Sequence, residues 1–222
     1  MKKYDWYLFD LDNTILDFNI ASNRAFEETL IHCKVIPNKD NAAIYHDINK
    51  SYWIQYEKGL IDSSTLREGR FEDFLKEINH EHDALEMSQI YLDFLLKNSH
   101  EIAGSIQVLD KLLKTANLAL ITNGLSDVQH KRIEKHQLKD YFQHIFISDE
   151  MGVSKPATGF FEIVHSKINM PNKKEVLVIG DNPISDIQGA TNFGYDSLYY
   201  NYGKNDDRHV EATYKIDSWE NF

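Results

Sequence analysis

The second half of the chain alternates between short apolar runs and amphipathic segments, and this alternation restricts the fold more than any other feature of the sequence. Apolar runs with the length and residue types of buried strands lie at residues 117–122, 144–148, 175–181 and 196–200. Amphipathic segments that predict helices lie between and around them, at residues 105–115, 126–136, 158–168 and 184–193. Strands that alternate with helices predict a parallel, doubly wound (Rossmann-like) α/β sheet.

The first hundred residues carry a different pattern. Residues 4–10 read as a short buried strand that ends at an aspartate. Residues 19–98 show helical periodicity, with apolar stripes formed by Phe71, Phe74, Leu75 and Ile78 and by Met87, Ile90, Tyr91, Phe94 and Leu95. We therefore predict an α/β core made of residues 1–16 and 100–222, interrupted by an all-helical cap at residues 17–99.

Two helix starts carry residues suited to capping. Ser63 or Ser64 is expected to cap the helix that holds the first apolar stripe, because a serine hydroxyl accepts a hydrogen bond from a backbone N–H of the first turn. Asn182 is expected to cap the helix that follows the strand at 175–181, with Pro183 at the first helical position.

Residues that can take part in chemistry follow four of the five predicted strands, three of them directly and one, KP, by a short loop. These segments are FDLDNT (9–14), TNG (122–124), KP (155–156) and GDNPISD (180–186). In a parallel α/β sheet, ligands bind at the carboxyl ends of the strands. The four segments are therefore expected to converge on one edge of the sheet.

Four carboxylates are predicted to meet at this edge, those of Asp10, Asp12, Asp181 and Asp186. Carboxylates gathered in one cleft repel each other, and a hard cation with oxygen ligands relieves that repulsion. Mg²⁺ usually takes a few carboxylates, waters and a phosphate oxygen. The sequence thus predicts a Mg²⁺ site, with Mn²⁺ or Co²⁺ as alternative ions.

The same edge offers groups that can bind a phosphate. Thr14 and Thr122 supply hydroxyls, Asn123 lies among backbone N–H groups that can face an anion, and Lys155 supplies a fixed positive charge. An ionised aspartate in line with a phosphoryl group can attack it and form an aspartyl-phosphate. A second acid nearby can protonate the leaving oxygen and then activate water.

Charge and composition limit the partners. The formal net charge of −11 disfavours binding to nucleic-acid polymers and to acidic membranes. One cysteine cannot form an internal disulfide, the start of the chain has no sustained apolar stretch, and the longest apolar runs are too short to cross a bilayer. We expect a cytoplasmic protein, monomeric or weakly homodimeric, that acts on a small molecule.

The four strand-end segments, FDLDNT, ITNG, the lysine of SKP and GDNPISD, resemble the motifs of the haloacid-dehalogenase superfamily of phosphohydrolases. The resemblance spans essentially the whole chain, including a helical cap between the first two motifs. It implies a Mg²⁺-dependent phosphatase with Asp10 as nucleophile and metal ligand. Asp12 would be the general acid and base, with its backbone carbonyl on the metal.

The resemblance also implies roles at the other strand ends. Thr122 and Lys155 would bind phosphate, Asp181 would be a metal ligand, and Asp186 would be either a ligand or an acid beside one. A sugar phosphate or another small phosphomonoester is an alternative substrate. A catalytically silent metal-binding or interaction protein on the same fold is an alternative of another class.

Four further stretches narrow the resemblance to the YjjG-type pyrimidine 5′-nucleotidases: SYWIQYEKG (51–59), GRFEDF (69–74), ITNGLSDVQ (121–129) and LKDYFQHIFISDEMGVSKP (138–156). This similarity implies a nucleoside monophosphate as substrate. In the cap, Trp53 and Tyr56 share one helix face, and Trp53 could stack on the base. Arg70 could bond a base carbonyl or a leaving-group oxygen.

Two other classes fit less well. A dehalogenase needs a nucleophilic carboxylate but has no need of the acids Asp12, Asp181 and Asp186 for metal and phosphate. A calcium-binding EF-hand loop starting at Asp10 would have Ile15 in place of glycine and Ala21 in place of glutamate.

Overall fold

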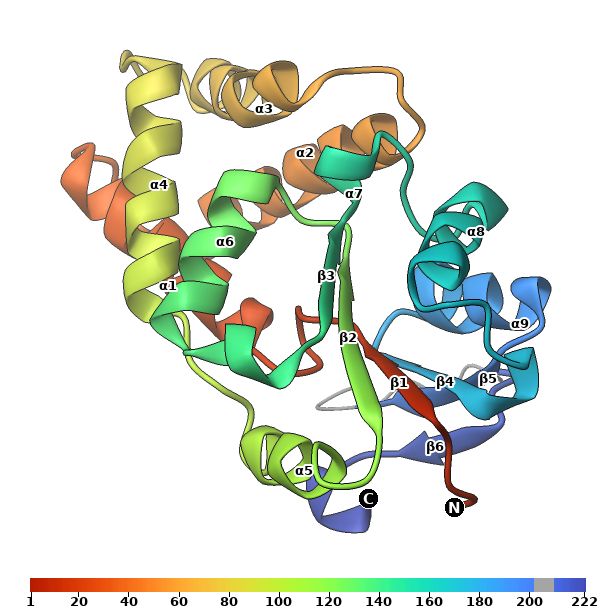
Figure 1. Cartoon of the computed structure of the whole chain (residues 1–222). Coiled ribbons are helices and arrows are strands. Elements are labelled where there is room, and N and C mark those ends of the chain that lie inside the picture. The colour runs from red at the N-terminus through yellow and green to blue at the C-terminus, as the bar shows by residue number, and fades with distance from the viewer. Residues whose placement is uncertain (202–209) are drawn as a thin grey trace. The chain divides into compact units, whose positions relative to one another are not determined.

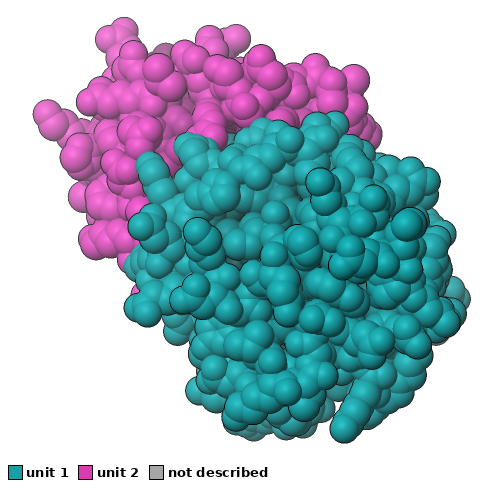
Figure 2. All heavy atoms as spheres, in the orientation of Figure 1, with its two compact units in different colours: residues 1–18, 100–222 teal, residues 19–99 magenta. Residues whose placement is uncertain are grey.

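The computed structural model describes residues 1–201 and 210–222 (Figure 1). The chain divides into two compact units (Figure 2). Residues 1–18 and 100–222 form one, called the core unit below, and residues 19–99 form the other, called the helical unit. The helical insertion was expected at residues 17–99, and the two compact units divide at Phe18 and at Ser99.

A six-stranded sheet forms the centre of the core unit, in the order β3-β2-β1-β4-β5-β6. Its strands are β1 (Trp6–Phe9), β2 (Asn117–Thr122), β3 (His144–Ile147), β4 (Val176–Gly180), β5 (Asp196–Tyr200) and β6 (Tyr214–Ile216). All neighbouring strands pair in parallel, which confirms the predicted doubly wound sheet. The sixth strand was not predicted, because three residues, the middle one exposed, are too short a run to give a periodic signal.

The sheet is buried on both faces. Successive side chains of β1 point to opposite faces. Trp6 and Leu8 lie in a core cluster with Phe160, Phe161 and Val164 of α8 (Thr158–Lys167), whereas Tyr7 and Phe9 lie in a second cluster with Val108, Leu109 and Leu112 of α5 (Ser105–Leu112). This two-sided burial explains why the strands read as continuous apolar runs.

Further helices complete the core unit: α6 (Ser126–Lys135), α7 (Ser148–Met151), η3 (Pro183–Gln188) and α9 (Gly189–Phe193), with short turns η1 (Leu138–Tyr141), η2 (Lys173–Glu175) and η4 (Trp219–Asn221). The segment predicted as one helix at 184–193 is a π-helical stretch, η3, continued by α9. The Asn182 side chain accepts hydrogen bonds from the backbone N–H groups of Ile184 and Ser185, at 2.9 and 3.1 Å, and Pro183 begins the helix. This cap was predicted correctly.

The helical unit contains α1 (Phe18–His32), which starts in the core unit, and α2 (Lys39–Glu57), α3 (Ser63–Glu77) and α4 (Ala84–Asn98). Its interior is aromatic: Phe26 stacks on Tyr45 with ring centroids 4.0 Å apart, and Tyr45 stacks on Phe71 at 5.1 Å. The predicted cap of α3 was wrong. Asp62 caps it by accepting from the backbone N–H of Thr65 at 2.8 Å, and the two serines fall within the first turn.

The chain leaves the core unit and returns to it through two paired segments. The backbone N–H of Asp17 donates to the carbonyl of His100 at 3.0 Å, and that of Ile102 donates to the carbonyl of Ile15 at 2.8 Å. Leu16 and Glu101 form an antiparallel bridge between these hydrogen bonds. The segment that leaves the core unit, residues 15–17, and the segment that returns to it, residues 100–102, therefore lie side by side.

Within the described residues, no helix combines the length and the apolar character that a membrane span requires.

Candidate active site

Three buried aspartates gather at the carboxyl ends of the central strands. Asp10 follows β1, and its backbone N–H donates to the carbonyl of Ile179 in β4 at 2.8 Å. Asp181 follows β4 directly, and Asp186 lies in η3. A carboxylate oxygen from each of the three lies within 4.8 Å of the others. Pairing of β1 with β4 thus brings together residues that are far apart in the sequence.

Lys155 lies inside this cluster. Its Nζ donates to Asp10 Oδ1 at 2.8 Å, to Asp186 Oδ1 at 2.7 Å and to the carbonyl of Ile121 at 3.0 Å. Burial alone lowers the pKa of the ammonium, but the two carboxylates outweigh burial, and the net effect raises the pKa of Lys155. The lysine is therefore charged at neutral pH, and all three of its N–H groups have acceptors.

The charge of the cluster is not balanced by this lysine. Three ionised aspartates against one lysine leave −3 + 1 = −2. Burial raises the pKa of Asp10 well above its ordinary value; Lys155 opposes this shift, and the neighbouring carboxylates of Asp186 and Asp181 add to it. The fully ionised cluster thus calls for two further positive charges.

One divalent cation fits this donor set. Mg²⁺ takes oxygen ligands at about 2.0–2.1 Å, so two oxygens on opposite sides of one ion lie about 4.2 Å apart. The oxygens of Asp10, Asp181 and Asp186 lie within 4.8 Å of one another, which is close to that span. Asp186 Oδ2 also accepts from the backbone N–H of Asn182 at 3.0 Å, so both of its oxygens already have donors.

The carboxylate of Asp10 is held at both oxygens. Lys155 binds Oδ1, and the hydroxyl of Thr14 donates to Oδ2 at 3.2 Å. Thr14 is fully buried, and its carbonyl accepts from the indole N–H of Trp219 at 3.1 Å. We expected Thr14 to bind phosphate; its hydroxyl is directed at Asp10 here, and a phosphate contact by this residue stays a prediction.

Thr122 is the last residue of β2 and is buried. Its Oγ1 accepts two hydrogen bonds, from Gln129 Nε2 at 2.8 Å and from the backbone N–H of Gly124 at 3.2 Å. A hydroxyl has one proton and two acceptor lone pairs. With both lone pairs engaged, this hydroxyl is set up as a hydrogen-bond donor, which is the role that a phosphate oxygen requires.

The side chain of Asn123 makes two hydrogen bonds with the main chain of Lys155. Asn123 Nδ2 donates to the carbonyl of Lys155 at 2.9 Å, and the backbone N–H of Lys155 donates to Asn123 Oδ1 at 3.0 Å. This reciprocal pair fixes the loop that carries the lysine to the end of β2. The predicted substrate contact of Asn123 remains a prediction.

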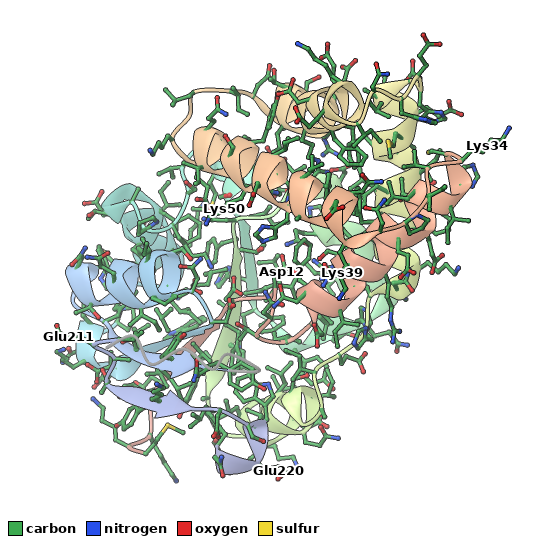
Figure 3. The ribbon with its side chains drawn as sticks, turned by 180° about the vertical axis from the view of Figure 1, so that it is seen from behind. Asp12, Lys34, Lys39, Lys50, Glu211 and Glu220 are labelled. Atoms are coloured by element: carbon green, nitrogen blue, oxygen red, sulfur yellow. The ribbon has the colours of Figure 1, made fainter. Side chains whose placement is uncertain are left out.

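Asp12 (labelled in Figure 3) lies in the loop after β1, and its carboxylate is not part of the three-aspartate cluster. We expected four clustered carboxylates, and three gather. Asp12 instead forms an ion pair with Arg132, and its Oδ2 accepts from Gln129 Nε2 at 2.9 Å. A metal contact through its backbone carbonyl stays a prediction.

Sequence reasoning missed Gln129 and Arg132. Both side chains are buried, with exposed fractions of 1%, and both lie on α6. The signal was present, because the buried face of α6 also includes Ile133, so two polar residues occupy positions where a helix normally places apolar ones. Because buried polar side chains are almost always hydrogen-bonded, two of them on one helix face indicate a hydrogen-bonded network.

The two predicted cap residues lie in the helical unit. The ring of Trp53 is partly buried and meets that of Tyr56 edge-on at 5.8 Å. Arg70 is buried, donates to Asn49 Oδ1 at 2.8 Å and lies 5.2 Å from the centre of the Tyr91 ring. Substrate binding by Trp53 and Arg70 stays a prediction.

A cavity of about 470 Å³ lies within the helical unit. Its wall combines the rings of Phe26, Tyr45 and Tyr91 with amide side chains that include Asn23 and Asn49. Arg70 is tied to this wall through its hydrogen bond to Asn49.

A doubly wound sheet with an aspartate–lysine cluster at the carboxyl ends of its central strands is typical of α/β proteins that bind a ligand at that edge. A family model described as haloacid dehalogenase-like hydrolase matches residues 7–199. The chain belongs to this family.

Named relatives agree with this assignment. Pyrimidine 5′-nucleotidase YjjG of Escherichia coli (strain K12) is 31% identical over 90% of this chain and 87% of its own length. Pyrimidine 5′-nucleotidase PynA of Streptococcus pneumoniae is 30% identical over 98% of this chain and 92% of its own. The crystal structure of the HAD-hydrolase YfnB from Bacillus subtilis bound to magnesium superposes with a TM-score of 0.90 at 31% identity, covering 99% of this chain and 97% of that one.

Proposed function

We propose that this chain is a Mg²⁺-dependent phosphomonoester hydrolase that acts through an aspartyl-phosphate on Asp10, with nucleoside monophosphates, pyrimidine ones in particular, as substrates. The observation that carries the proposal is the environment of Asp10. Its carboxylate is fixed by Lys155 and Thr14 beside Asp181 and Asp186, in a cluster that lacks two positive charges. A dianionic phosphate needs both a cation and an oriented nucleophile, and this edge of the sheet offers a place for each.

In the proposed first step, an Asp10 oxygen attacks the phosphorus, and the bond from phosphorus to the ester oxygen breaks. Asp12 supplies the proton that the leaving alcohol needs. Charge on the phosphoryl oxygens is stabilised by the Lys155 ammonium and the Thr122 hydroxyl, since both are preorganised donors.

In the second step, Asp12 is a carboxylate and takes a proton from water. The water oxygen attacks phosphorus, the bond to Asp10 breaks, and inorganic phosphate leaves. A bound Mg²⁺, held by Asp10 and Asp181 with Asp186 beside them, would neutralise the carboxylates and polarise the phosphoryl group.

Two observations favour a nucleotide over other phosphomonoesters. The alignments with the two relatives named above as pyrimidine 5′-nucleotidases cover at least 90% of this chain, at 30–31% identity. The helical unit also contains a cavity whose wall includes amide side chains, which can bond to the edge of a base. Trp53 and Arg70 remain the predicted contacts to base or leaving group.

A panel of phosphomonoesters tests the proposal. Phosphate release would be measured for pyrimidine and purine nucleoside monophosphates, sugar phosphates and p-nitrophenyl phosphate, with Mg²⁺ and with EDTA. We expect Mg²⁺-dependent release with the highest kcat/KM for a pyrimidine monophosphate, and none from Asp10→Asn. A preference for sugar phosphates would reject the nucleotidase assignment alone, whereas activity that persists in EDTA or in Asp10→Asn would reject the mechanism.

A further inference from the structure

The helix α6 carries a polar network on its buried face. Gln129 and Arg132 lie three residues apart, so their side chains leave the same side of the helix. The Arg132 guanidinium donates to Asp12 Oδ1 and to Gln129 Oε1, the latter at 2.9 Å, and lies 5.6 Å from the ring centre of Phe18. A guanidinium buried this deeply is costly unless it is paired, and Asp12 supplies the pair.

Both oxygens of the Asp12 carboxylate are engaged from α6. Arg132 binds Oδ1, and Gln129 Nε2 binds Oδ2 at 2.9 Å. Two donors on different oxygens fix the rotation of a carboxylate as well as its position. The Asp12 side chain is itself 26% exposed, so it remains accessible to a reactant while α6 holds it.

Gln129 also ties Asp12 to the phosphate-binding side of the site. Its Nε2 donates to Thr122 Oγ1 at 2.8 Å as well as to Asp12. The orientation of the amide is determined, because Arg132 can only donate and therefore needs Oε1. The side chain of Gln129 fills the space in which a Cβ of Gly124 would lie.

We propose that Gln129 and Arg132 are positioning residues that hold the Asp12 carboxylate in the orientation from which it exchanges protons with the leaving group and with water, and that Gln129 couples this orientation to Thr122. The inference rests on the proposed phosphatase activity. Neither residue touches substrate in this scheme; each acts through Asp12. An exposed aspartate in a loop without these donors would sample many orientations, and a misplacement of about 1 Å can cost about 100-fold in rate.

The test compares substrates with different leaving groups. Arg132→Met and Gln129→Met remove the donors while keeping an unbranched side chain. For a nucleoside monophosphate, whose leaving alcohol needs a proton, we expect kcat to fall about 10- to 100-fold with a smaller change in KM. For p-nitrophenyl phosphate, whose leaving group needs no proton, the fall should be several times smaller. Arg132→Lys, which keeps the charge, should recover part of the loss.

A double-mutant cycle separates positioning from structural damage. In an Asp12→Asn background, Arg132→Met should cause little further loss, because its effect passes through Asp12. Additive losses in that cycle, or equal losses on both substrates, would overturn the inference, as would faster turnover by Arg132→Met. Lys131→Met, an exposed change on the same helix, is the matched control and should match the wild type on both substrates.

The wild-type enzyme distinguishes the two hypotheses. If it hydrolyses no phosphomonoester with Mg²⁺, the proposed function fails, and the positioning roles fail with it. If it is active and the variants keep the wild-type ratio of activities on the two substrates, only the positioning roles fail. Thermal unfolding of Arg132→Lys and Gln129→Met would show whether each variant is folded at the assay temperature.

Discussion

Two glycines in the core unit stand where a side chain of the candidate site occupies the space of a Cβ. At Gly180, the last residue of β4, a Cβ would overlap the carboxylate of Asp186, and at Gly124 it would overlap the amide of Gln129. The absence of a side chain at these positions is therefore a requirement of the site, because neither neighbour is free to move away: Asp186 is bound by Lys155, and Gln129 is bound by Thr122.

Gly180→Ala should displace Asp186 and weaken the metal site. We expect the Mg²⁺ concentration for half-maximal activity to rise about 10-fold or more, since groups that orient metal ligands typically affect affinity by that factor. Titration of activity with Mg²⁺ measures it. Gly159→Ala is the matched control, because the nearest atom to its Cβ would be Val153 Cγ2 at an ordinary 3.8 Å. An unchanged Mg²⁺ dependence in Gly180→Ala would show that Asp186 has no part in holding the ion.

Cys33 should be unreactive in the folded protein. Burial, with a smaller contribution from the charge of Glu86, raises the pKa of its thiol to about 11. The thiolate is the reactive species, so at pH 8 the population available to a thiol reagent is small. We expect slow modification of native protein and rapid, stoichiometric modification in denaturant, measured by absorbance with Ellman's reagent. Rapid reaction at pH 8 without denaturant would contradict the buried position of Cys33.

At the scale of single residues, the sequence located the groups in the segments that follow the strands and missed those that reach the site from α6. Asp10 and Asp181 are identified from their places directly after β1 and β4, because parallel strands deliver their ends to one edge. Lys155 lies farther along, in the loop after α7. Gln129 and Arg132 depend on the rotation of α6 about its axis, which is set by packing. Since the sequence did not reveal these two partners on α6, it predicted Asp12 as a fourth member of the acid cluster, whereas its carboxylate binds Gln129 and Arg132.

Among the elements, α2 offers a test of local helix stability. Asn38 caps it, with Oδ1 accepting from the backbone N–H of Asn41 at 2.8 Å. Asn38→Ala removes this acceptor and should lower the free energy of unfolding by about 1 kcal/mol. Asn38→Ser keeps an acceptor and should lose much less. Urea unfolding followed by circular dichroism measures both variants, and equal losses in the two would mean that the hydrogen bond is not the stabilising contact.

The sequence predicted most elements because their periodicity is set locally, and it missed elements whose form is set by neighbours. Five strands and the longer helices between them follow from apolar runs and amphipathic stripes, whereas the four-residue α7 was not predicted. The strand β6 forms because β5 offers it an edge, and the π-helical form of η3 is not encoded in an apolar period. The π-helical stretch contains Asp186, in keeping with the frequent occurrence of such turns at functional sites.

For the whole molecule, Mg²⁺ should raise thermal stability. The cluster of Asp10, Asp181, Asp186 and Lys155 has a charge of −2 when ionised, and a cation that binds only the folded state stabilises it. At 100 times its Kd the gain is about 2.7 kcal/mol. Differential scanning fluorimetry with Mg²⁺ and with EDTA measures this shift.

A charge-matched pair of variants serves as the control. Asp181→Asn removes one ligand and should abolish the Mg²⁺ shift, while leaving the metal-free protein no less stable, because one of three repelling carboxylates is gone. Glu134→Gln removes an exposed acid on α6 and should keep the full shift. Loss of the shift in both variants would indicate a diffuse charge effect in place of a bound ion.

The cytoplasmic location and the monomeric or weakly dimeric state stay predictions from the sequence.

The pairing of residues 15–17 with residues 100–102 has a consequence for how such a chain can be altered. Two antiparallel segments that leave and re-enter side by side are the two arms of a hairpin, and the helical unit occupies the place of its loop. The two arms are joined by the same hydrogen bonds whatever segment lies between them. The entropy cost of closing a longer loop grows only slowly with its length. Insertions of very different size could therefore be exchanged between residues 17 and 100, while the sheet that positions the acids is left unchanged.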